Sequence, residues 1–474
     1  MYEAIESLLD TLGSEYQEVV IRSHFFTRNS VLCRDGELDE TTTEKLAGIG
    51  IRALTNGSWG FASFSGNDQS IVDPKSSLEK TLRDATKISR VLSSSKGQKT
   101  ALAPMNPSVG KFQAPSISQD PPSLEEIMKL ALNIDKTALS SSELIKSTGV
   151  ALGTIQEKKE LFTLSGTRVE VLNQHSELSI SLIAARNGRL ESFAESLATL
   201  GSIEDLSRGN DFIELATRTA AMAIRKLDAR IPPAGMHEVI MDPAIVGLLC
   251  HEAIGHTVEA DFVLSGSITK GKLGELVASP TVTMIDSGRN MDGSGWLPID
   301  DEGVQASDTV LIDKGILSSY LHNRETAAIM DVDPTGNARA GGYSREPIIR
   351  MTNTFLKPGD LKREEIVENT KKGILLTGAG SGEADANAEF VFDVAEAYPI
   401  QNGEIKTKEL FRGVAISGNA FETLKSVSAV GNNFKLKMGT GACLKGGQPV
   451  KVDGGGPSIR CKIRIAGRNQ EGLG

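Results

Sequence analysis

Two of the chain's six histidines lie five residues apart, in the stretch His251-Glu252-Ala253-Ile254-Gly255-His256. Neutral imidazoles bind Zn²⁺ well, and a catalytic zinc ion keeps one coordination position open for water. Glu252 directly follows the first histidine, so its carboxylate can face a zinc-bound water and accept a proton from it. These residue types predict metal-assisted hydrolysis, with His251 and His256 as metal ligands and Glu252 as the general base. The alternative is an amphipathic helix on which the histidines are incidental.

The spacing of the two histidines is unusual for a metal site on a helix. In the zinc-protease pattern HExxH the two ligands lie four residues apart and project about 40° from each other. Residues five apart project about 140° from each other on an ideal α-helix. A π-helical turn would return positions five apart to one side, and a loosening of the helix at Gly255 would serve the same end. We therefore expect a departure from α-helical geometry near Gly255.

A third metal ligand must come from elsewhere in the chain. The side chains with suitable chemistry are Glu259, Asp261, His322, Cys443 and Cys461. The two carboxylates follow the histidines closely and could equally be surface groups or hydrogen-bond partners of the imidazoles. Cys461 lies in the alternating stretch RCKIRI, where a buried apolar residue is the ordinary interpretation. Cys443 lies in the Gly-rich stretch GTGACLKGGQ, bordered by Lys437 and Lys445, and an exposed loop with positive neighbours favours a thiolate. On physical grounds we rank Cys443 first.

Two other stretches invite a functional interpretation. Thr377-Gly378-Ala379-Gly380-Ser381-Gly382 superficially resembles a nucleotide loop, but it lacks the GK[ST] of a P-loop and a strand follows it rather than a helix. We expect a tight turn beside the active site there. Asp300, Asp301 and Glu302 form an acidic triplet, for which a solvated turn is a better explanation than a second cation site.

Further polar residues and a rival metal complete the set of candidates. Tyr343, Arg345, Arg350 and Asn353 could contact substrate backbone or an oxyanion, or form a polar hinge between strands.

Two histidines, a cysteine and an axial methionine are a copper set, and Met438 is near Cys443 in the sequence. Glu252 has no role in electron transfer, which favours hydrolysis. A non-catalytic binding or assembly subunit is the third class, and it would not need Glu252.

The composition limits the kinds of partner and compartment. Of 474 residues, 39% are hydrophobic and 24% are charged, as in an ordinary globular protein. The net charge of −10 argues against direct binding of nucleic acid. We expect no signal peptide, because MYEAIESLLDTLG has no basic region or long apolar run, and no membrane span, because no stretch approaches 18 apolar residues. Four cysteines without CxxC spacing are not a disulfide framework, which favours a reducing cytoplasm.

The elements that would position these residues fall into two parts. Before residue 230 we expect helices at 2–12, 76–92, 124–147 and 212–229, an antiparallel meander over 17–64, strands near 149–157, 161–172 and 177–186, and a Pro- and Ser-rich linker at 93–123. After a boundary near Pro232, short strands and Gly-rich turns dominate, with one conspicuous helix from Pro243 to about Thr257. We therefore predict an α+β fold. Its N-terminal domain, 1–230, has helices packed on an antiparallel sheet, and its strand-rich C-terminal domain, 231–474, carries the metal-binding helix.

Several stretches of the C-terminal half resemble a known family. HEAIGHTVEADF is similar to the metal-binding segment of the TldD/PmbA family, whose TldD members carry HExxxH. WLPIDDEGV, PTGNARAGGYSREPIIRMTNTFLKPGD, EFVFDVAEAYPIQNGEI and SAVGNNFKLKMGTGACLKGGQPV resemble family segments in the expected order, between about Pro233 and Pro457. The resemblance implies one zinc ion per chain, held by His251, His256 and Cys443, with Glu252 as the general base.

The same resemblance implies an activity and partners. TldD-type proteins hydrolyse peptide bonds in unfolded or small peptides, which are threaded into an enclosed groove and bound by strand addition. Family members act as dimers, often of a catalytic TldD chain and a PmbA/TldE-like chain that lacks the metal ligands. This chain keeps all four residues and so resembles the catalytic subunit, in a homodimer or a heterodimer. Its N-terminal domain would supply dimer contacts or the substrate groove.

Overall fold

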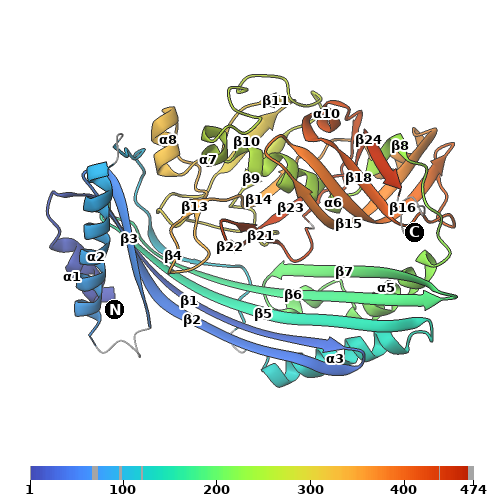
Figure 1. Cartoon of the computed structure of the whole chain (residues 1–474), viewed down its shortest axis with the longest axis horizontal. Coiled ribbons are helices and arrows are strands. Elements are labelled where there is room, and N and C mark those ends of the chain that lie inside the picture. The colour runs from blue at the N-terminus through green and yellow to red at the C-terminus, as the bar shows by residue number, and fades with distance from the viewer. Residues whose placement is uncertain (1, 67–72, 96–98, 119–120, 437, 468–474) are drawn as a thin grey trace.

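The computed structural model describes residues 2–66, 73–95, 99–118, 121–436 and 438–467, and a long curved sheet lies beside a group of shorter strands and helices (Figure 1). The N-terminal residues form the curved sheet and its helices. Residues from β8 (Gly235–Met241) onward form the second group. Within the described ranges, none of the helices combines the length and the apolar character that crossing a membrane would take.

The N-terminal sheet has seven strands in the order β3-β2-β1-β5-β6, with β4 and β7 both paired to β6. The strands are β1 (Tyr16–Arg34), β2 (Glu37–Thr55), β3 (Ser58–Ser65), β4 (Val109–Gln113), β5 (Ile145–Thr163), β6 (Arg168–Arg186) and β7 (Arg189–Leu200). Antiparallel pairing joins β1, β2 and β5 along almost all of their 19 residues. The antiparallel meander predicted over 17–64 is confirmed.

Two parts of this sheet differ from the prediction. The strand expected at 161–172 crosses a tight turn, which the backbone hydrogen bond from Thr163 to Thr167 closes. The chain therefore forms two long strands there, and the following strand, β7, is additional. The expected linker at 93–123 contributes β4, which pairs in parallel with β6. Its five residues, VGKFQ, are too few and too polar for their alternation to be recognised. Residues 96–98 and 119–120 of this segment lie outside the described residues.

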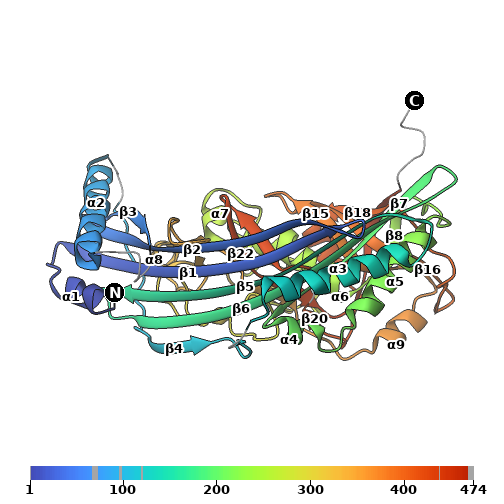
Figure 2. The same ribbon diagram turned by 90° about the horizontal axis from the view of Figure 1, so that it is seen from below.

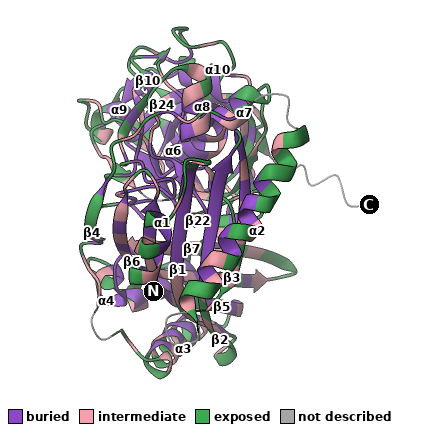
Figure 3. Cartoon of the chain, turned by 90° about the vertical axis from the view of Figure 1, so that its left-hand side faces the viewer, coloured by how far each residue is buried: buried purple, intermediate pink, exposed green. Residues whose placement is uncertain are grey.

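Helices cover one face and one end of the N-terminal sheet. α3 (Leu124–Ser140) and α5 (Phe212–Lys226) lie over the face of the sheet that is turned toward the viewer in Figure 2, and α4 (Ile203–Ser207) precedes α5. Ser123 and Glu126 form a capping box that begins α3. α1 (Tyr2–Asp10) and α2 (Pro74–Ser95) pack at the end of the sheet near β3, and α2 has a buried and an exposed side (Figure 3). These amphipathic helices leave the opposite face of the sheet free to meet the C-terminal group.

The C-terminal group contains two larger sheets. One has the order β15-β8-β24-β18-β16-β17, with β19 paired to β24. In addition, β15 pairs with β16, so the strands from β15 to β16 form a closed ring. The other has the order β11-β10-β9-β14-β23-β20. The remaining strands are β9 (Met284–Ser287), β10 (Asp308–Asp313), β11 (Ile316–Leu317), β12 (Ala338–Arg339), β13 (Ile348–Ile349), β14 (Asn353–Leu356), β15 (Lys372–Ala384), β16 (Glu389–Gln401), β17 (Glu404–Ile405), β18 (Val414–Asn419), β19 (Ala429–Val430), β20 (Lys435–Leu436), β21 (Ala442–Lys445), β22 (Gln448–Lys451), β23 (Asp453–Gly456) and β24 (Ile459–Gly467).

One helical segment runs through the centre of the C-terminal group. It consists of α6 (Pro243–Leu248), the π-helix η1 (Leu249–Gly255) and the 3₁₀ turn η2 (His256–Val258). It contacts β14, β15, β16 and β23, so strands of both sheets surround it. The other helices are α7 (Ala260–Leu264), α8 (Arg324–Met330), α9 (Arg363–Glu368) and α10 (Ala420–Lys425). The predicted α+β fold is confirmed, and its most buried helix is the one that carries the paired histidines.

Candidate metal centre

The central helix changes its hydrogen bonding where the histidines lie. It begins at Asp242, whose side chain accepts a hydrogen bond from the backbone of Ile245. At its far end the backbone N–H of His256 donates to the carbonyl of His251, five residues earlier. This π-helical bonding brings the two rings together, with their centroids 5.1 Å apart. The predicted departure from α-helical geometry is confirmed.

Gly255 is required by packing rather than by an unusual backbone. Its φ of −54° and ψ of −49° are ordinary helical values. A Cβ atom built at this position would lie 1.9 Å from Sδ of Met351 and 3.0 Å from the carbonyl oxygen of Cys250. Of the two explanations that the sequence offers, the π-helical turn is therefore the one that the chain uses.

The third donor comes from a hairpin far along the chain. β21 and β22 pair around Gly446 and Gly447, whose φ angles of +57° and +70° form the tight turn. Cys443 on β21 places its Sγ 3.4 Å from Nε2 of His256. One donor atom each from His251, His256 and Cys443 lies within 4.8 Å of the others. The prediction of an exposed loop at Cys443 is wrong. This residue is 6% exposed, because the hairpin folds against the helix.

A buried arginine holds this hairpin in place. Arg350 has no exposed surface, and it donates from Nη2 to the carbonyl of Cys443 and from Nη1 to the carbonyl of Gln448, both at 2.6 Å. Arg339 donates to the carbonyl of Lys451 at the end of the hairpin. Arg350 thus supports the cysteine through its backbone. The sequence signal for this function is a lone arginine within the apolar run PIIRM.

The other candidate ligands have different partners. Glu259 accepts a hydrogen bond from Nδ1 of His256 at 2.9 Å, which makes it the hydrogen-bond partner that the sequence left open. Asp261 is paired with Lys445. His322 contacts the hydroxyl of Thr326, and Cys461 lies on β24, paired with β8. Lys437 lies outside the described residues.

The contacts between the donors shift their protonation. Burial raises the pKa of the Cys443 thiol, but the neighbouring imidazoles of His251 and His256 outweigh it and bring the pKa down to about 4. Burial lowers the pKa of His256, but its contacts with Cys443 and Glu259 raise it to about 10. The thiol is therefore held as the thiolate, which is the form that binds metals.

The donor set fits a zinc ion. His251 is fully buried, yet neither of its ring nitrogens has a hydrogen-bond partner within the described structure. Buried polar atoms are rarely left without a partner unless a ligand or ion satisfies them. Two imidazoles and a thiolate suit zinc, and three protein ligands leave a position open. Glu252 lies at the edge of this group, with Oε2 4.0 Å from Nε2 of His256 and its side chain 28% exposed.

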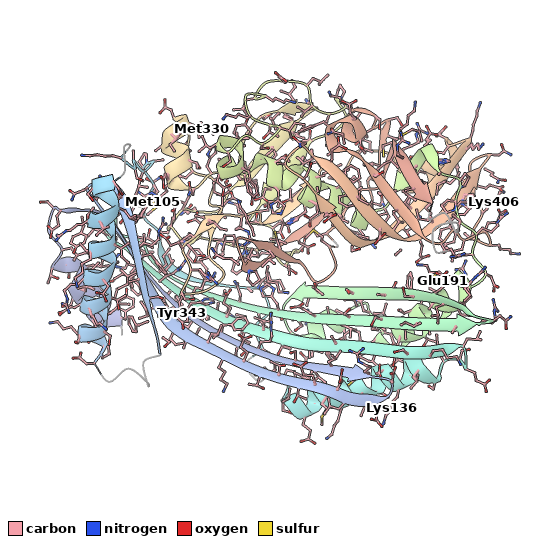
Figure 4. The ribbon with its side chains drawn as sticks, viewed as in Figure 1. Met105, Lys136, Glu191, Met330, Tyr343 and Lys406 are labelled. Carbon is pink, nitrogen blue, oxygen red and sulfur yellow. The ribbon has the colours of Figure 1, made fainter. Side chains whose placement is uncertain are left out.

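The four polar residues between 343 and 353 that the sequence singles out all form packing contacts or hydrogen bonds with other segments. The ring of Tyr343 lies against the backbone of Gly48 on the N-terminal sheet (Figure 4). Arg345 accepts a hydrogen bond at its carbonyl from Arg22. The amide of Asn353 donates to the carbonyls of Ser287 and Asn290. Together with Arg350, these residues hold segments of the C-terminal group against one another and against the sheet.

The prediction of a solvated turn at the acidic triplet 300–302 is wrong, because all three side chains are buried. Asp300, Asp301 and Glu302 are 1%, 5% and 2% exposed. Glu302 accepts a hydrogen bond from Arg52 at 2.9 Å, and Asp301 lies 3.5 Å from Nζ of Lys159. Burial, and then the charge of Glu302, raises the pKa of Asp300 to about 8. The ion-pair partners of Asp301 and Glu302 belong to the N-terminal sheet, so these two carboxylates join the two parts of the chain.

The prediction of a tight turn at 377–382 is also wrong. These residues belong to β15, with a bulge between Ala379 and Gly382 where it pairs with β16. The bulged segment lines a cavity of about 900 Å³, together with the face of β7 that includes Phe193 and with residues near Thr440. Figure 1 shows β7 beneath β15 and β16. The Gly-rich stretch therefore helps to form a groove between the N-terminal sheet and the C-terminal group.

Comparison with known families covers almost the whole chain. The model of the PmbA/TldA metallopeptidase C-terminal domain matches residues 234–467. The models of domain 1 and of the central domain from the same family match residues 19–89 and 117–227. Both latter segments contribute strands to the one N-terminal sheet.

Individual relatives agree with the family match. A protein of Methanothermobacter thermautotrophicus named metalloprotease is 36% identical over 463 residues, covering 97% of this chain and 98% of its own length. A zinc metalloprotease TldD homolog of Saccharolobus solfataricus is 34% identical over 312 residues, covering 65% of this chain and 69% of its own. The crystal structure of TldE from Thermococcus kodakarensis has the same fold, with a TM-score of 0.75 at 18% identity, covering 98% of this chain and 100% of that one.

Proposed function

The chain belongs to the PmbA/TldD metallopeptidase family, and from this membership we propose that it is a zinc-dependent peptidase of the TldD type, which hydrolyses unfolded or small peptides. The observation that carries the proposal is the cluster of His251, His256 and Cys443 beside Glu252. We assign one zinc ion per chain to these three ligands. The relative named zinc metalloprotease supports the choice of metal.

The residues of the cluster would divide the work of hydrolysis. Zinc, when bound, supplies a Lewis acid that polarises a carbonyl and lowers the pKa of water. Glu252 accepts the proton of the attacking water and passes it to the leaving amine. Its partly exposed carboxylate, next to the imidazole of His256, suits that exchange. Glu259 holds the ring of His256 so that Nε2 faces Cys443.

The groove between the two parts of the chain supports an extended peptide as the substrate. Within the described residues, β7 pairs on one side only, with β6, and the cavity of about 900 Å³ follows β7. Across the cavity, β15 has a partner strand on its β8 side only at residues 374–376. Backbone groups at such strand edges can bind an extended peptide by strand addition. The backbone groups of an unfolded or small peptide are free on both sides for such pairing, which favours unfolded or small peptides as substrates.

Partners and compartment are part of the same proposal. We assign the chain to a homodimer or to a heterodimer with a PmbA/TldE-like chain, in which the N-terminal domain, 1–230, supplies dimer contacts or the substrate groove and the domain at 231–474 supplies the metallopeptidase site. The four cysteines, all free and buried, suit a reducing cytoplasm. The net charge of −10 makes direct contact with nucleic acid unfavourable. The alternative function is a non-catalytic peptide-binding or assembly subunit of a TldD/PmbA complex.

Metal analysis combined with peptide cleavage tests the proposal. We expect one zinc per chain, and we expect Glu252→Gln to keep the zinc while cleavage falls by about 10²–10⁴-fold, the usual contribution of a general base. Cys443→Ser should lower zinc occupancy. Glu204→Gln, a change of an exposed glutamate on α4, is the matched control and should retain both properties. Bound zinc without cleavage by any complex of the wild-type chain would favour the non-catalytic subunit.

A further inference from the structure

We propose that Glu259 and Lys445 join His256 and Cys443 in one closed unit, and that Lys445 is a positioning residue for the metal ligands. The inference rests on the proposed zinc site and adds two residues that do not contact the metal. It follows from three observations: the burial of Glu259, the contacts of Lys445, and the position of Lys445 on the same strand as the cysteine.

Glu259 is a carboxylate without exposed surface. Its Oε2 accepts a hydrogen bond from Nδ1 of His256 at 2.9 Å, which leaves Nε2 as the nitrogen that faces Cys443. A hydrogen bond to the second ring nitrogen fixes both the tautomer and the orientation of a metal-binding histidine. A buried carboxylate needs a compensating positive charge, and the imidazole cannot supply it when it is a neutral ligand. Another cation must therefore face Glu259.

Lys445 supplies that cation. Its ammonium nitrogen lies within hydrogen-bond distance of four acceptor oxygens: Oε2 of Glu259 at 3.0 Å, both carboxylate oxygens of Asp261 at 2.8 and 2.9 Å, and the carbonyl oxygen of Ile349 at 3.0 Å. It also lies 4.1 Å from the centre of the Phe262 ring. The side chain of Lys445 is only 10% exposed and that of Glu259 has no exposed surface, so the ion pair between these two residues is buried. Asp261 is 37% exposed. Exposed ion pairs contribute little, whereas loss of one member of a buried pair leaves the other charge uncompensated.

The position of Lys445 turns these contacts into a closed unit. Cys443 and Lys445 lie two residues apart on β21, and side chains two apart on a strand point to the same face. The strand therefore presents a thiolate to His256 and an ammonium to the carboxylate behind His256. The path from the Cys443 sulfur runs through His256 and Glu259 to Lys445 and returns along the backbone of β21. Neither the imidazole nor the hairpin can move without breaking a contact of this path.

Zinc affinity of the metal-free chain, measured by competition with a chelator, tests the inference. We expect Glu259→Gln and Lys445→Met each to weaken zinc binding about 10–100-fold, the usual effect of residues that orient metal ligands. Because both changes open the same path, the zinc affinity of the double variant should be little lower than that of the single variant that binds zinc less tightly. Multiplied losses would show two independent effects and would overturn the inference, as would affinities equal to that of the wild type.

Lys451→Met is the matched control. Lys451 lies on β22 of the same hairpin and is similarly buried, but its ammonium binds Glu177 and the carbonyl of Thr440. Among the described residues it forms no ion pair with Glu259 or Asp261. We expect its zinc affinity to stay within about threefold of the wild type. A loss as large as that of Lys445→Met would mean that any anchor of the hairpin suffices, which contradicts the closed unit.

Cobalt in place of zinc separates positioning from simple stabilisation. The visible spectrum of bound Co²⁺ reports the geometry of its ligands, whatever the stability of the fold. At saturating Co²⁺ we expect altered spectra for Glu259→Gln and Lys445→Met, and the wild-type spectrum for Lys451→Met. Unaltered spectra in the first two variants would overturn the positioning function. A wild-type chain that binds neither metal would instead overturn the proposed zinc site itself.

Discussion

At the scale of single residues, Gly255 lets the central helix approach β14 and its flanking residues without a side chain in the way. The space for a Cβ is occupied by the sulfur of Met351. Because Gly255 ends the π-helical turn, the same close contact fixes where the helix passes from π-helical to 3₁₀ hydrogen bonding, directly before His256. A small packing detail therefore controls the distance between two proposed ligands.

Gly255→Ala should destabilise the fold and weaken zinc binding together. Inserting a methyl group into a filled core costs about 1–3 kcal/mol, because neighbours must move. Urea unfolding and zinc competition measure the two effects. Gly342→Ala is the control, since the nearest atom to a Cβ there is Nδ1 of His24 at 4.0 Å. Equal behaviour of the two alanine variants would contradict the importance of the Met351 contact.

At the scale of elements, the β21–β22 hairpin is held from two sides. Lys445 connects the hairpin to α7. Arg350, which lies between β13 and β14, binds two carbonyl groups of the hairpin. A two-stranded hairpin has little stability of its own. These contacts from outside the hairpin therefore decide whether the cysteine is in place before a metal arrives.

Arg350→Met should release the hairpin. Hydrogen bonds to charged groups contribute about 1.5–3 kcal/mol each, so the loss of two such bonds should lower the free energy of unfolding by about 3–6 kcal/mol. Hydrogen exchange should become faster at the backbone amides of 442–451. Arg34→Met, which changes an exposed arginine paired with Asp39, should alter stability by less than about 1 kcal/mol. Unchanged exchange in the hairpin would contradict the supporting function of Arg350.

At the scale of the whole molecule, buried charges connect the N-terminal sheet to the C-terminal group. Arg22 and Arg52 of the sheet lie beside Asp301 and Glu302, and further pairs follow the same face. At the other end of the sheet, Glu191 of β7 accepts a hydrogen bond from Arg412 (Figure 4). The groove is therefore bounded by two parts whose relative position is fixed by paired charges.

His175 makes this interface sensitive to acid. Burial, followed by the charge of Lys451, lowers the pKa of His175 from 6.5 to about 3, against the opposing effect of Glu157. Between pH 6.5 and about 3 the unfolded chain binds a proton at this residue and the folded chain does not. Stability from this group is thus complete above pH 6.5 and falls as the pH decreases, by up to about 1.4 kcal/mol per pH unit.

Urea unfolding between pH 4 and 7 measures this effect. The stability of His175→Gln should fall less steeply with acid than that of the wild type. His237→Gln, which changes a partly exposed histidine bonded to the carbonyl of Pro233, should keep the wild-type slope. Equal slopes for the wild type and His175→Gln would contradict the low pKa in the folded chain.

The sequence predicts local features of this molecule better than its long-range pairings. The spacing of His251 and His256, with Gly255 between them, is enough to predict a departure from α-helical geometry, because helix geometry depends on near neighbours. The structure then decides for the π-helical turn. The burial of Asp301 is not predictable in this way, since its partners Arg22 and Lys159 lie far away in the chain. For the same reason the Gly-rich stretch around Cys443 indicates an exposed loop, although contacts with distant residues bury this cysteine.

The order of strands along the chain has a consequence for the protein's synthesis. β24 lies between β8 and β18, so more than 200 residues must follow β8 before this antiparallel neighbour exists. Cys443 likewise follows His256 by 187 residues. At 5–20 residues per second a ribosome needs about 10–40 s to make that stretch. With the proposed metal site, the last ligand is translated so late that the site stays incomplete during the period when the nascent chain is unfolded and easiest to cut.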